Sequence, residues 1–469
     1  KNQNPKITIS LSPTLLSLLD DDDLKERFPI WLNSRIEILK DIPKSYEKAS
    51  FYLSEFFAEQ LETWSKIDYD LINKFAELQS TGVVDLLTCA ATHGYLPLLR
   101  ENIEAIRGQI KTAIREHQRL IGERPLGIWL PECAYFENLD KILINSGIRY
   151  TILDGHGILN ASPRPRYGLY SPICSRNGVA FFGRDSNSTL PVWSSTDGYP
   201  GNPKYREFHK DVGWELSKEK LNNLGYEEPR PIGIKLHKIT NKKIDLNKKS
   251  IYEPNEIKSQ VRKHANSYLI DRKKQLEYLN RNMTVEPILV APFDAELFGH
   301  WWFEGPLFLE EIFVQAKKFD IKFTNLRDYL KESQTLQLCN PSPSSWGQGG
   351  FHTYWINEKN SWIIPEWNKA SKAMINICSS GVSKTSDIRY LRQAARELLL
   401  SQSSDWSFIL RAGTTTELAK NRIDRHLKRF WDLIGVIRGD SSMTNRQLID
   451  IEEEDSIFPL IQVSDWMKI

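Results

Sequence analysis

Short apolar runs alternate with amphipathic segments over the first third of the chain. The apolar runs have the length of buried strands and lie at residues 7–11, 83–91, 126–130 and 150–153. Segments with apolar residues at helical spacing lie among them, at 28–40, 52–64, 98–116 and 139–146, the last closed by Gly147. Strands that alternate with helices predict parallel βα units, so an α/β structure is expected here.

The pattern changes between residues 155 and 230, where Pro, Gly, Asn, Arg and aromatic residues dominate. This composition predicts long inserted loops, where binding residues often lie. The alternation then returns. Strands are expected at 231–236, 287–292 and 321–324, and helices at 257–279 and 307–318.

A third pattern begins after the Pro- and Ser-rich break at residues 339–345. A Trp-rich stretch spans 346–367, and helical spacing then predicts helices at 366–378, 386–401 and 414–438. These segments predict a separate helical domain at the C-terminal end.

Composition narrows the classes of function. The 469 residues suit one barrel with an appended domain as well as several smaller domains. The net charge of +2 gives no reason to expect nucleic acid or a membrane surface as partner. Five widely spaced cysteines without a Cys-x-x-Cys pair predict a reduced, cytoplasmic setting, and no apolar run has membrane length.

Two acidic motifs carry the candidate chemistry. The first motif, at residues 127–135, reads Gly-Ile-Trp-Leu-Pro-Glu-Cys-Ala-Tyr and contains Glu132. The second motif, at residues 291–306, contains Asp294. Each motif starts as a buried strand and ends with a carboxylate among aromatic side chains. Glycosidic-bond chemistry needs two carboxylates, one at the anomeric carbon and one that protonates the leaving oxygen. Aromatic walls suit sugars, because the C–H faces of a pyranose stack on rings.

Each carboxylate could also have a structural role in place of a catalytic one. Pro131 ends strand pairing, so Glu132 can turn into a cavity, but a surface loop gives the same pattern. Asp294 lies too far upstream to cap the helix that begins near Glu304. Glu296 is a second candidate acid that spacing alone does not separate from Asp294.

His93 follows the predicted strand at 83–91 and could contact a sugar hydroxyl or a catalytic carboxylate, although a lone histidine is more often structural. Metal catalysis is the rival chemistry. The histidines are dispersed, and no pair has the local spacing of a zinc site. No metal and no cofactor are predicted.

Taken in order, four blocks of this sequence resemble glycoside hydrolase family 57, most closely its glycogen-branching members. The blocks are 90–98, 127–135, 291–306 and 345–355. The resemblance covers most of the chain. It implies a (β/α)7 barrel, a retaining mechanism, Glu132 as nucleophile and Asp294 as general acid/base.

The resemblance also implies an α-glucan partner such as amylose or glycogen, cleaved at an α-1,4 bond and joined to a 6-hydroxyl as an α-1,6 branch. The implied substrate-binding residues are His93, Trp214, His300, Trp301, Trp346, Trp355, Asp405 and Trp406. Trp214, Trp346 and Trp355 are expected to lie outside the core and to stack an acceptor sugar.

The implied barrel occupies residues 1–154 and 231–338, with inserted loops at 155–230 and the helical domain at 339–469. One departure is clear. The family's His-x-His-Leu-Pro motif on the first barrel strand does not occur in this sequence. Either the sequence is truncated or this homologue lacks that strand, so the strand at 7–11 is expected to lack one neighbour.

Two alternatives stay open. A 4-α-glucanotransferase or α-amylase of the same family would use the same carboxylates and differ in the product linkage. A non-catalytic glucan-binding protein would bind without turnover. The sequence indicates no oligomeric state.

Overall fold

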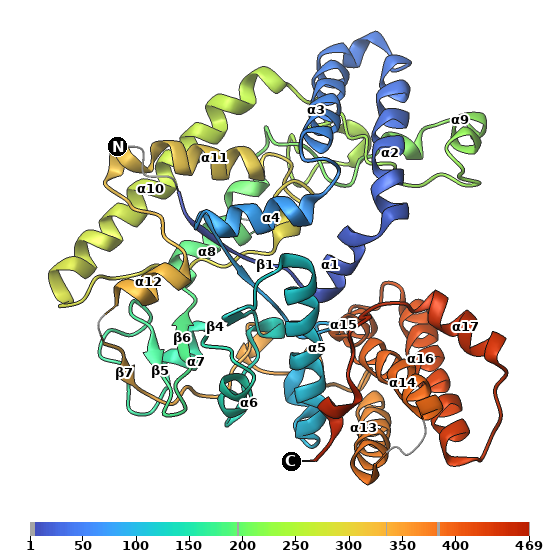
Figure 1. The fold of residues 1–469 in the computed structure, drawn as a ribbon. Coiled ribbons are helices and arrows are strands. Elements are labelled where there is room, and N and C mark those ends of the chain that lie inside the picture. The colour runs from blue at the N-terminus through green and yellow to red at the C-terminus, as the bar shows by residue number, and fades with distance from the viewer. Residues whose placement is uncertain (1–4, 195–196, 334, 382–384, 469) are drawn as a thin grey trace. The chain divides into compact units, whose positions relative to one another are not determined.

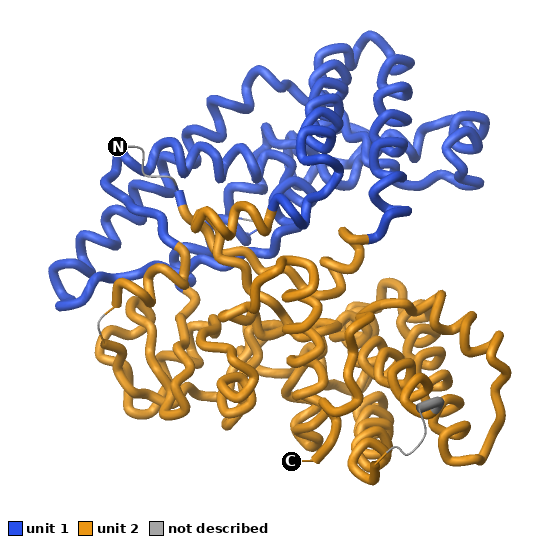
Figure 2. The backbone as a smooth tube through the Cα atoms, viewed as in Figure 1, with its two compact units in different colours: residues 1–5, 21–74, 185–324 blue, residues 6–20, 75–184, 325–469 orange. Residues whose placement is uncertain are grey.

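The protein forms two compact units, each assembled from several stretches of sequence (Figures 1 and 2). The structure is a computed structural model that describes residues 5–194, 197–333, 335–381 and 385–468. Unit 1 comprises residues 1–5, 21–74 and 185–324, and unit 2 comprises residues 6–20, 75–184 and 325–469. The division into four segments that the sequence predicts stays a prediction.

Parallel strands form the framework of unit 2. The strands are β1 (Ile7–Ser10), β2 (Val84–Leu87), β3 (Gly127–Ile128), β4 (Tyr150–Leu153), β5 (Ile173–Cys174), β6 (Ala180–Gly183) and β7 (Gln337–Leu338). β1 pairs with β2, and β3, β4 and β6 form a second parallel run. A bridge between Thr88 and Ile128 connects β2 to β3. β5 runs antiparallel to β6 and parallel to β7.

The central strands are buried on both faces, as is typical of parallel strands covered on both sides. All residues of β2, β4 and β6 are buried. Gly127 in β3 makes room for the ring of Tyr150, because a Cβ at Gly127 would lie 2.3 Å from that ring. The Tyr150 hydroxyl in turn donates to the buried Asp85 of β2 at 2.7 Å. These contacts fix the register of β2, β3 and β4.

The barrel implied by the resemblance is not seen. The paired strands form two open sheets in the orders β1-β2 and β3-β4-β6-β5-β7. Within the described part of the chain, β1 has β2 as its strand partner and no other.

Three predicted strands are not strands in the structure. Residues 231–236 alternate in burial as a strand would, but Gly233 has a φ of 85°, which breaks the extended backbone. The segment 287–292 begins and ends with proline, which cannot donate to a strand ladder. Residues 321–324 belong to no strand of the structure.

The helices of unit 2 are α1 (Pro13–Asp20), α5 (Ile103–Ile121), α6 (Leu139–Asn145), α7 (Gly155–Leu159), α12 (Leu326–Glu332), α13 (Ile363–Ser380), α14 (Thr385–Ser401), α15 (Ser404–Ala412), α16 (Thr416–Arg438) and α17 (Asn445–Glu454). The helical C-terminal region is confirmed. One hydrophobic core runs from the strands through α5 into α13, α14 and α16.

A turn near the C-terminal end of the chain packs on α5. Trp466 is fully buried, and its ring fills the space beside Gly108, where a Cβ would lie 2.5 Å away. Arg107 Nε donates to Asp465 O at 2.8 Å, and Arg115 forms an ion pair with the Asp465 carboxylate. Residues far apart in sequence therefore complete this part of the core.

Unit 1 has its own hydrophobic core. Its helices are α2 (Asp22–Lys40), α3 (Glu47–Lys66), α8 (Ser186–Trp193), α9 (Lys218–Asn223), α10 (Ile257–Asn282) and α11 (Gly305–Gln315), and α4 (Leu71–Ser80) crosses from unit 1 into unit 2. The predicted helices at 28–40, 52–64 and 257–279 lie within α2, α3 and α10. The stretch 155–230 is not loops alone, because it contains β5, β6 and α7 to α9.

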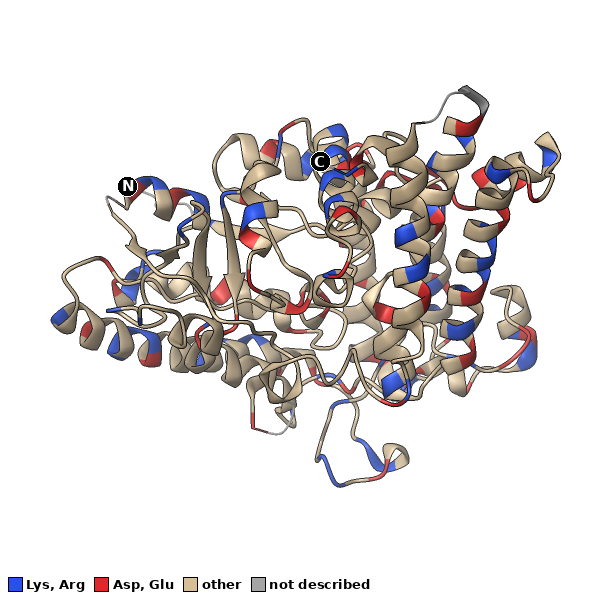
Figure 3. Ribbon diagram, turned by 90° about the horizontal axis from the view of Figure 1, so that it is seen from below, with Lys and Arg blue, Asp and Glu red and all other residues tan. Residues whose placement is uncertain are grey.

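Basic and acidic residues are interspersed along the helices (Figure 3). No helix in the described residues combines the length and the apolar character that crossing a membrane requires.

Candidate active site

Four polar side chains of unit 2 follow the C-terminal ends of neighbouring parallel strands. His93 comes after β2 and Glu132 after β3, while Asp154 and Arg184 directly follow β4 and β6. Arg184 and Asp154 are in contact, with 3.2 Å between Nη1 and Oδ2. This edge of a parallel sheet is where α/β proteins place their binding sites.

Glu132 lies in a strained turn. Glu132 and Cys133 have φ values of 61° and 51°, in the left-handed region that residues other than glycine rarely adopt. Such strain costs about 1–3 kcal/mol per residue and concentrates at functional sites. Cys133 is buried, whereas the Glu132 side chain is 19% exposed. The turn therefore directs the carboxylate away from the core.

Trp346, from a distant part of the sequence, stabilises this turn through hydrogen bonds. Its indole Nε1 donates to Glu132 Oε2 at 2.5 Å, and its backbone N donates to Glu132 O at 3.0 Å. Trp129 packs edge-on against the Trp346 ring, with 5.0 Å between centroids. The structure thus brings together two of the predicted site residues, Glu132 and Trp346.

His93 is a third predicted residue at the same place. Its Nδ1 lies 3.8 Å from Glu132 Oε1 and 2.8 Å from Ser404 Oγ. Burial lowers the pKa of His93, but Cys89, Glu132 and Asp405 together outweigh burial and raise the pKa to about 9. The His93 imidazole therefore lies beside the Glu132 carboxylate in surroundings that favour its cationic form.

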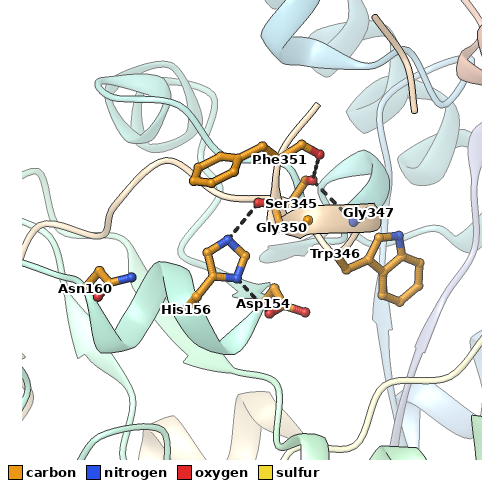
Figure 4. A pocket seen from close by; sticks show the side chains of 9 residues that line it. Asp154, His156, Asn160, Ser345, Trp346, Gly347, Gly350 and Phe351 are labelled. Atoms are coloured by element: carbon orange, nitrogen blue, oxygen red, sulfur yellow. Dashed lines mark hydrogen bonds and ion pairs between the residues drawn. The ribbon is translucent and has the colours of Figure 1, made fainter. Parts of the chain in front are cut away.

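A pocket of about 500 Å³ opens beside Trp346 (Figure 4). It is lined by Asp154, His156, Asn160, Ser345, Trp346, Gly347, Gly349, Gly350 and Phe351. In Figure 4 the His156 ring lies between the Asp154 carboxylate and the backbone of Gly350. The pocket therefore lies beside the indole that donates to Glu132.

The second predicted motif lies in unit 1. Asp294, Glu296 and His300 are exposed there. Trp301 is 51% exposed, stacks on Phe208 with 4.3 Å between centroids, and donates from Nε1 to Glu296 Oε2 at 3.1 Å. Asp294 and Glu296 are both exposed, so the choice between them as the acid stays a proposal. Glu132 and Asp294 belong to different units, so their pairing stays a proposal.

The tryptophans expected to stack an acceptor differ in burial. Trp214 is 53% exposed, as expected. The expectation that Trp355 lies outside the core is wrong, because it is 2% exposed and stacks on Tyr95 at 4.4 Å. Gly347 permits this burial, since a Cβ there would lie 2.5 Å from the Trp355 ring. The buried Trp355 ring does not offer a face to a sugar.

Asp405 and Trp406 lie at the start of α15. Trp406 donates from Nε1 to Leu400 O at 2.8 Å and is partly buried, which indicates a structural role. Asp405 accepts from Ser403 Oγ at 3.0 Å and acts on His93 through its charge.

One group within the described residues has the donor atoms for a metal ion, namely Glu397, His426 and Asp455. His426 Nδ1 lies 2.7 Å from Glu397 Oε2, and Arg429 forms an ion pair with Asp455. A cation would compete with Arg429 for the same carboxylate. The cluster is therefore better explained as a buried ion-pair network between helices.

Sequence reasoning missed Asp154, His156, Arg184 and Ser404. Asp154 directly follows the predicted strand at 150–153. It could have been found in the same way as Glu132, as a carboxylate at the end of a predicted strand. Arg184 was missed because it follows β6, which lies in a stretch that was predicted to form loops. No local pattern connects Ser404 to His93, which is 311 residues away.

Comparison with known proteins gives matches over nearly the whole chain. A model of glycosyl hydrolase family 57 matches residues 20–340, and a model of the C-terminal region of 1,4-alpha-glucan branching enzymes matches residues 366–466. A 1,4-alpha-glucan branching enzyme of Thermococcus kodakarensis is 30% identical over 98% of this chain and 71% of its own length.

Solved structures agree with these matches. The alpha-amylase AmyC from Thermotoga maritima superposes with a TM-score of 0.92 at 33% identity, over 100% of this chain and 90% of that one. The branching enzyme from Pyrococcus horikoshii gives a TM-score of 0.89 at 30% identity, over 100% and 88%. The Thermococcus branching enzyme was solved in complex with glucose and additives. It gives a TM-score of 0.88 at 30% identity, over 100% of this chain and 88% of that one.

Proposed function

The chain belongs to glycosyl hydrolase family 57, and we propose that within this family it is a 1,4-α-glucan branching enzyme. The observation that carries this proposal is the branching-enzyme C-terminal region, which extends over most of the helical part of unit 2. That region supplies Ser404, whose hydroxyl lies 2.8 Å from His93 beside Glu132.

In the proposed mechanism Glu132 attacks the anomeric carbon of an α-1,4 glucan. Asp294 protonates the departing glycosidic oxygen, and a covalent glycosyl–enzyme forms. Asp294 then takes the proton from the 6-hydroxyl of a second glucan chain, which attacks and forms the α-1,6 branch. Two carboxyl groups that work in this way lie about 5–5.5 Å apart. A crystal structure with a bound glucan would measure that distance.

The surroundings of Glu132 suit this role. Trp346 donates to one carboxylate oxygen, and the His93 imidazole lies near the other. These contacts orient the carboxylate before the substrate arrives, and such positioning supplies much of the rate in enzymes. The exposed Trp214 is proposed to hold the acceptor glucan.

Hydrolysis is the second candidate activity, favoured by the similarity to an α-amylase. It differs only in the acceptor, since water replaces the 6-hydroxyl. Transfer prevails where the site holds an acceptor and excludes water.

The test incubates the protein with amylose, treats the product with an enzyme that cleaves only α-1,6 bonds, and measures the chains released. Branching predicts new short chains after debranching with few new reducing ends before it. Reducing ends without α-1,6 bonds would identify an amylase instead.

Glu132→Gln is the matched control for this test, because an amide cannot form the covalent ester. It should keep the fold and lower turnover by about 10³-fold or more. Near-normal branching by this variant would exclude Glu132 as the nucleophile.

A further inference from the structure

We propose that Asp154 and His156 are positioning residues that hold Trp346 and, through its indole N–H, orient the Glu132 carboxylate. This inference rests on the proposed function, in which Glu132 is the nucleophile. Asp154 and His156 lie outside the four sequence blocks that carry the family resemblance.

The first step of the argument is the pair of contacts made by His156. Its Nε2 lies 2.7 Å from Gly350 O, and its Nδ1 lies 3.0 Å from Asp154 Oδ1. A carbonyl oxygen can only accept, so Nε2 carries a proton and donates to Gly350. The carboxylate at the other nitrogen fixes the plane of the ring, as carboxylates do for other functional histidines.

The second step is the turn that His156 holds. Residues 345–351 fold back on themselves, and Ser345 N donates to Gly350 O at 2.9 Å. Gly349 and Gly350 have φ values of 77° and 80°, so the turn needs glycine at both positions. His156 therefore donates to the same carbonyl that closes the turn. Trp346 lies within this turn and depends on its closure.

The third step is a second route from Asp154 to Trp346. Arg184 pairs with Asp154 Oδ2 at 3.2 Å, and its guanidinium carbon lies 5.4 Å from the centroid of the Trp346 ring. Asp154 thus supports Trp346 twice, through the turn by way of His156 and through the ring by way of Arg184.

Loss of His156 should let the turn and the indole move. The hydrogen bond to Glu132 Oε2 then lengthens, and the nucleophile no longer points in one direction. A displacement of about 1 Å in a catalytic group can lower the rate as much as 100-fold. Substrate binding should change little, because neither positioning residue holds the glucan in this proposal.

The test is a double-mutant cycle measured as kcat and KM on amylose. His156→Ala should lower kcat about tenfold or more and change KM less than about twofold. Trp346→Phe keeps the ring but removes the N–H, and it should lower kcat by a similar factor. In the Trp346→Phe background, His156→Ala should have little further effect, because the bond it supports is already lost.

Asp154→Asn gives a second measurement if His156→Ala does not fold. It keeps the size of the side chain but weakens the contacts with His156 and Arg184, so kcat should fall while KM is kept. Leu159→Ala, at an exposed position on the same helix α7, is the matched control and should behave as wild type. Thermal melting of each variant shows whether the fold survives.

Additive effects of the two substitutions, or wild-type kcat in folded His156→Ala and Asp154→Asn, would overturn the positioning role. Failure of the proposed function has a different signature. In that case the wild-type protein makes no α-1,6 bonds, or Glu132→Gln stays active, whatever the residue at position 156.

Discussion

The Glu132 carboxylate lies between side chains contributed by distant parts of the sequence. Trp346 and His93 approach its two oxygens, and Ser404 holds His93 from the C-terminal region. The strained backbone at Glu132 and His93, with φ values of 61° and 53°, persists because these contacts support it. The sequence indicated Glu132 and, through the resemblance, its neighbours His93 and Trp346, but no local pattern pointed to Ser404.

At Asp294 the acid role gives a kinetic prediction. Asp294→Asn should lose activity on amylose by about 10²-fold or more, because an amide cannot protonate the leaving oxygen. Substrates whose leaving group needs no proton, such as glucosyl fluoride, should recover much of the first step. Equal losses on both kinds of substrate would argue against the acid role. Glu296→Gln tests the second candidate acid, and it should keep most of the activity on both kinds of substrate if Asp294 is the acid.

Two of the tryptophans that were expected to stack an acceptor sugar should respond in opposite ways. Trp355→Ala removes a buried ring stacked on Tyr95 and should lower the free energy of unfolding by about 3–5 kcal/mol. Trp214→Ala, at a position 53% exposed, should change that free energy by less than about 0.5 kcal/mol. The Trp214 variant should reduce branching more than hydrolysis, and equal reduction of both would contradict an acceptor role. Urea unfolding and the two assays measure these effects.

At the scale of elements, α14 and α16 are joined by a buried ion pair. Glu397 is fully buried, and His426 Nδ1 lies 2.7 Å from its Oε2. Burial raises the pKa of Glu397, and the bond to His426 opposes that effect. Removing one partner leaves a buried group poorly compensated.

His426→Ala should therefore lower the free energy of unfolding by about 3–5 kcal/mol. Replacing both partners by apolar residues, as in Glu397→Met with His426→Leu, should be milder than the single change. Urea titrations of the three proteins measure this. A double variant less stable than His426→Ala would contradict the interpretation.

The elements that could be predicted from sequence are those with a strong periodic signal. β1, β4, α3 and α16 lie close to their expected positions, because apolar spacing there is regular and the segments are bounded by turns. β6 was missed because four apolar residues lie inside a Gly- and Pro-rich stretch, and α15 because it is short. Residues 231–236 show the converse error, since alternate burial does not require a strand where Gly233 turns the chain.

At the scale of the whole molecule, each unit has its own core, and several histidines are buried without charge. Burial lowers the pKa values of His117, His237 and His264 to about 4. Among the described residues neither ring nitrogen of His117 has a hydrogen-bond partner, so protonation places in the core a charge that Glu123 compensates only in part.

These shifts predict loss of stability in acid. Between pH 6.5 and pH 4 these histidines bind protons in the unfolded chain but not in the folded chain. The free energy of unfolding therefore falls as pH falls. His93 acts in the opposite direction, because its raised pKa contributes stability below pH 6.5 that is lost toward pH 9. For His117 alone the acid loss is roughly 3 kcal/mol.

Urea unfolding at several pH values checks this prediction, with His117→Leu as the variant. The variant should show a shallower fall in stability between pH 6.5 and pH 4 than the wild type. An unchanged slope would mean that other groups control the acid sensitivity.

The packing of Trp466 on α5 has a consequence for the synthesis of the protein. Gly108 leaves the ribosome long before Trp466, yet the two lie against each other in the finished core. Until the later residue emerges, the Gly108 surface of α5 and the Arg107 and Arg115 side chains beside it lack the turn that covers them. A chain that ends before residue 466 therefore cannot complete the packing on α5, so its unit 2 should be less stable than that of the full chain.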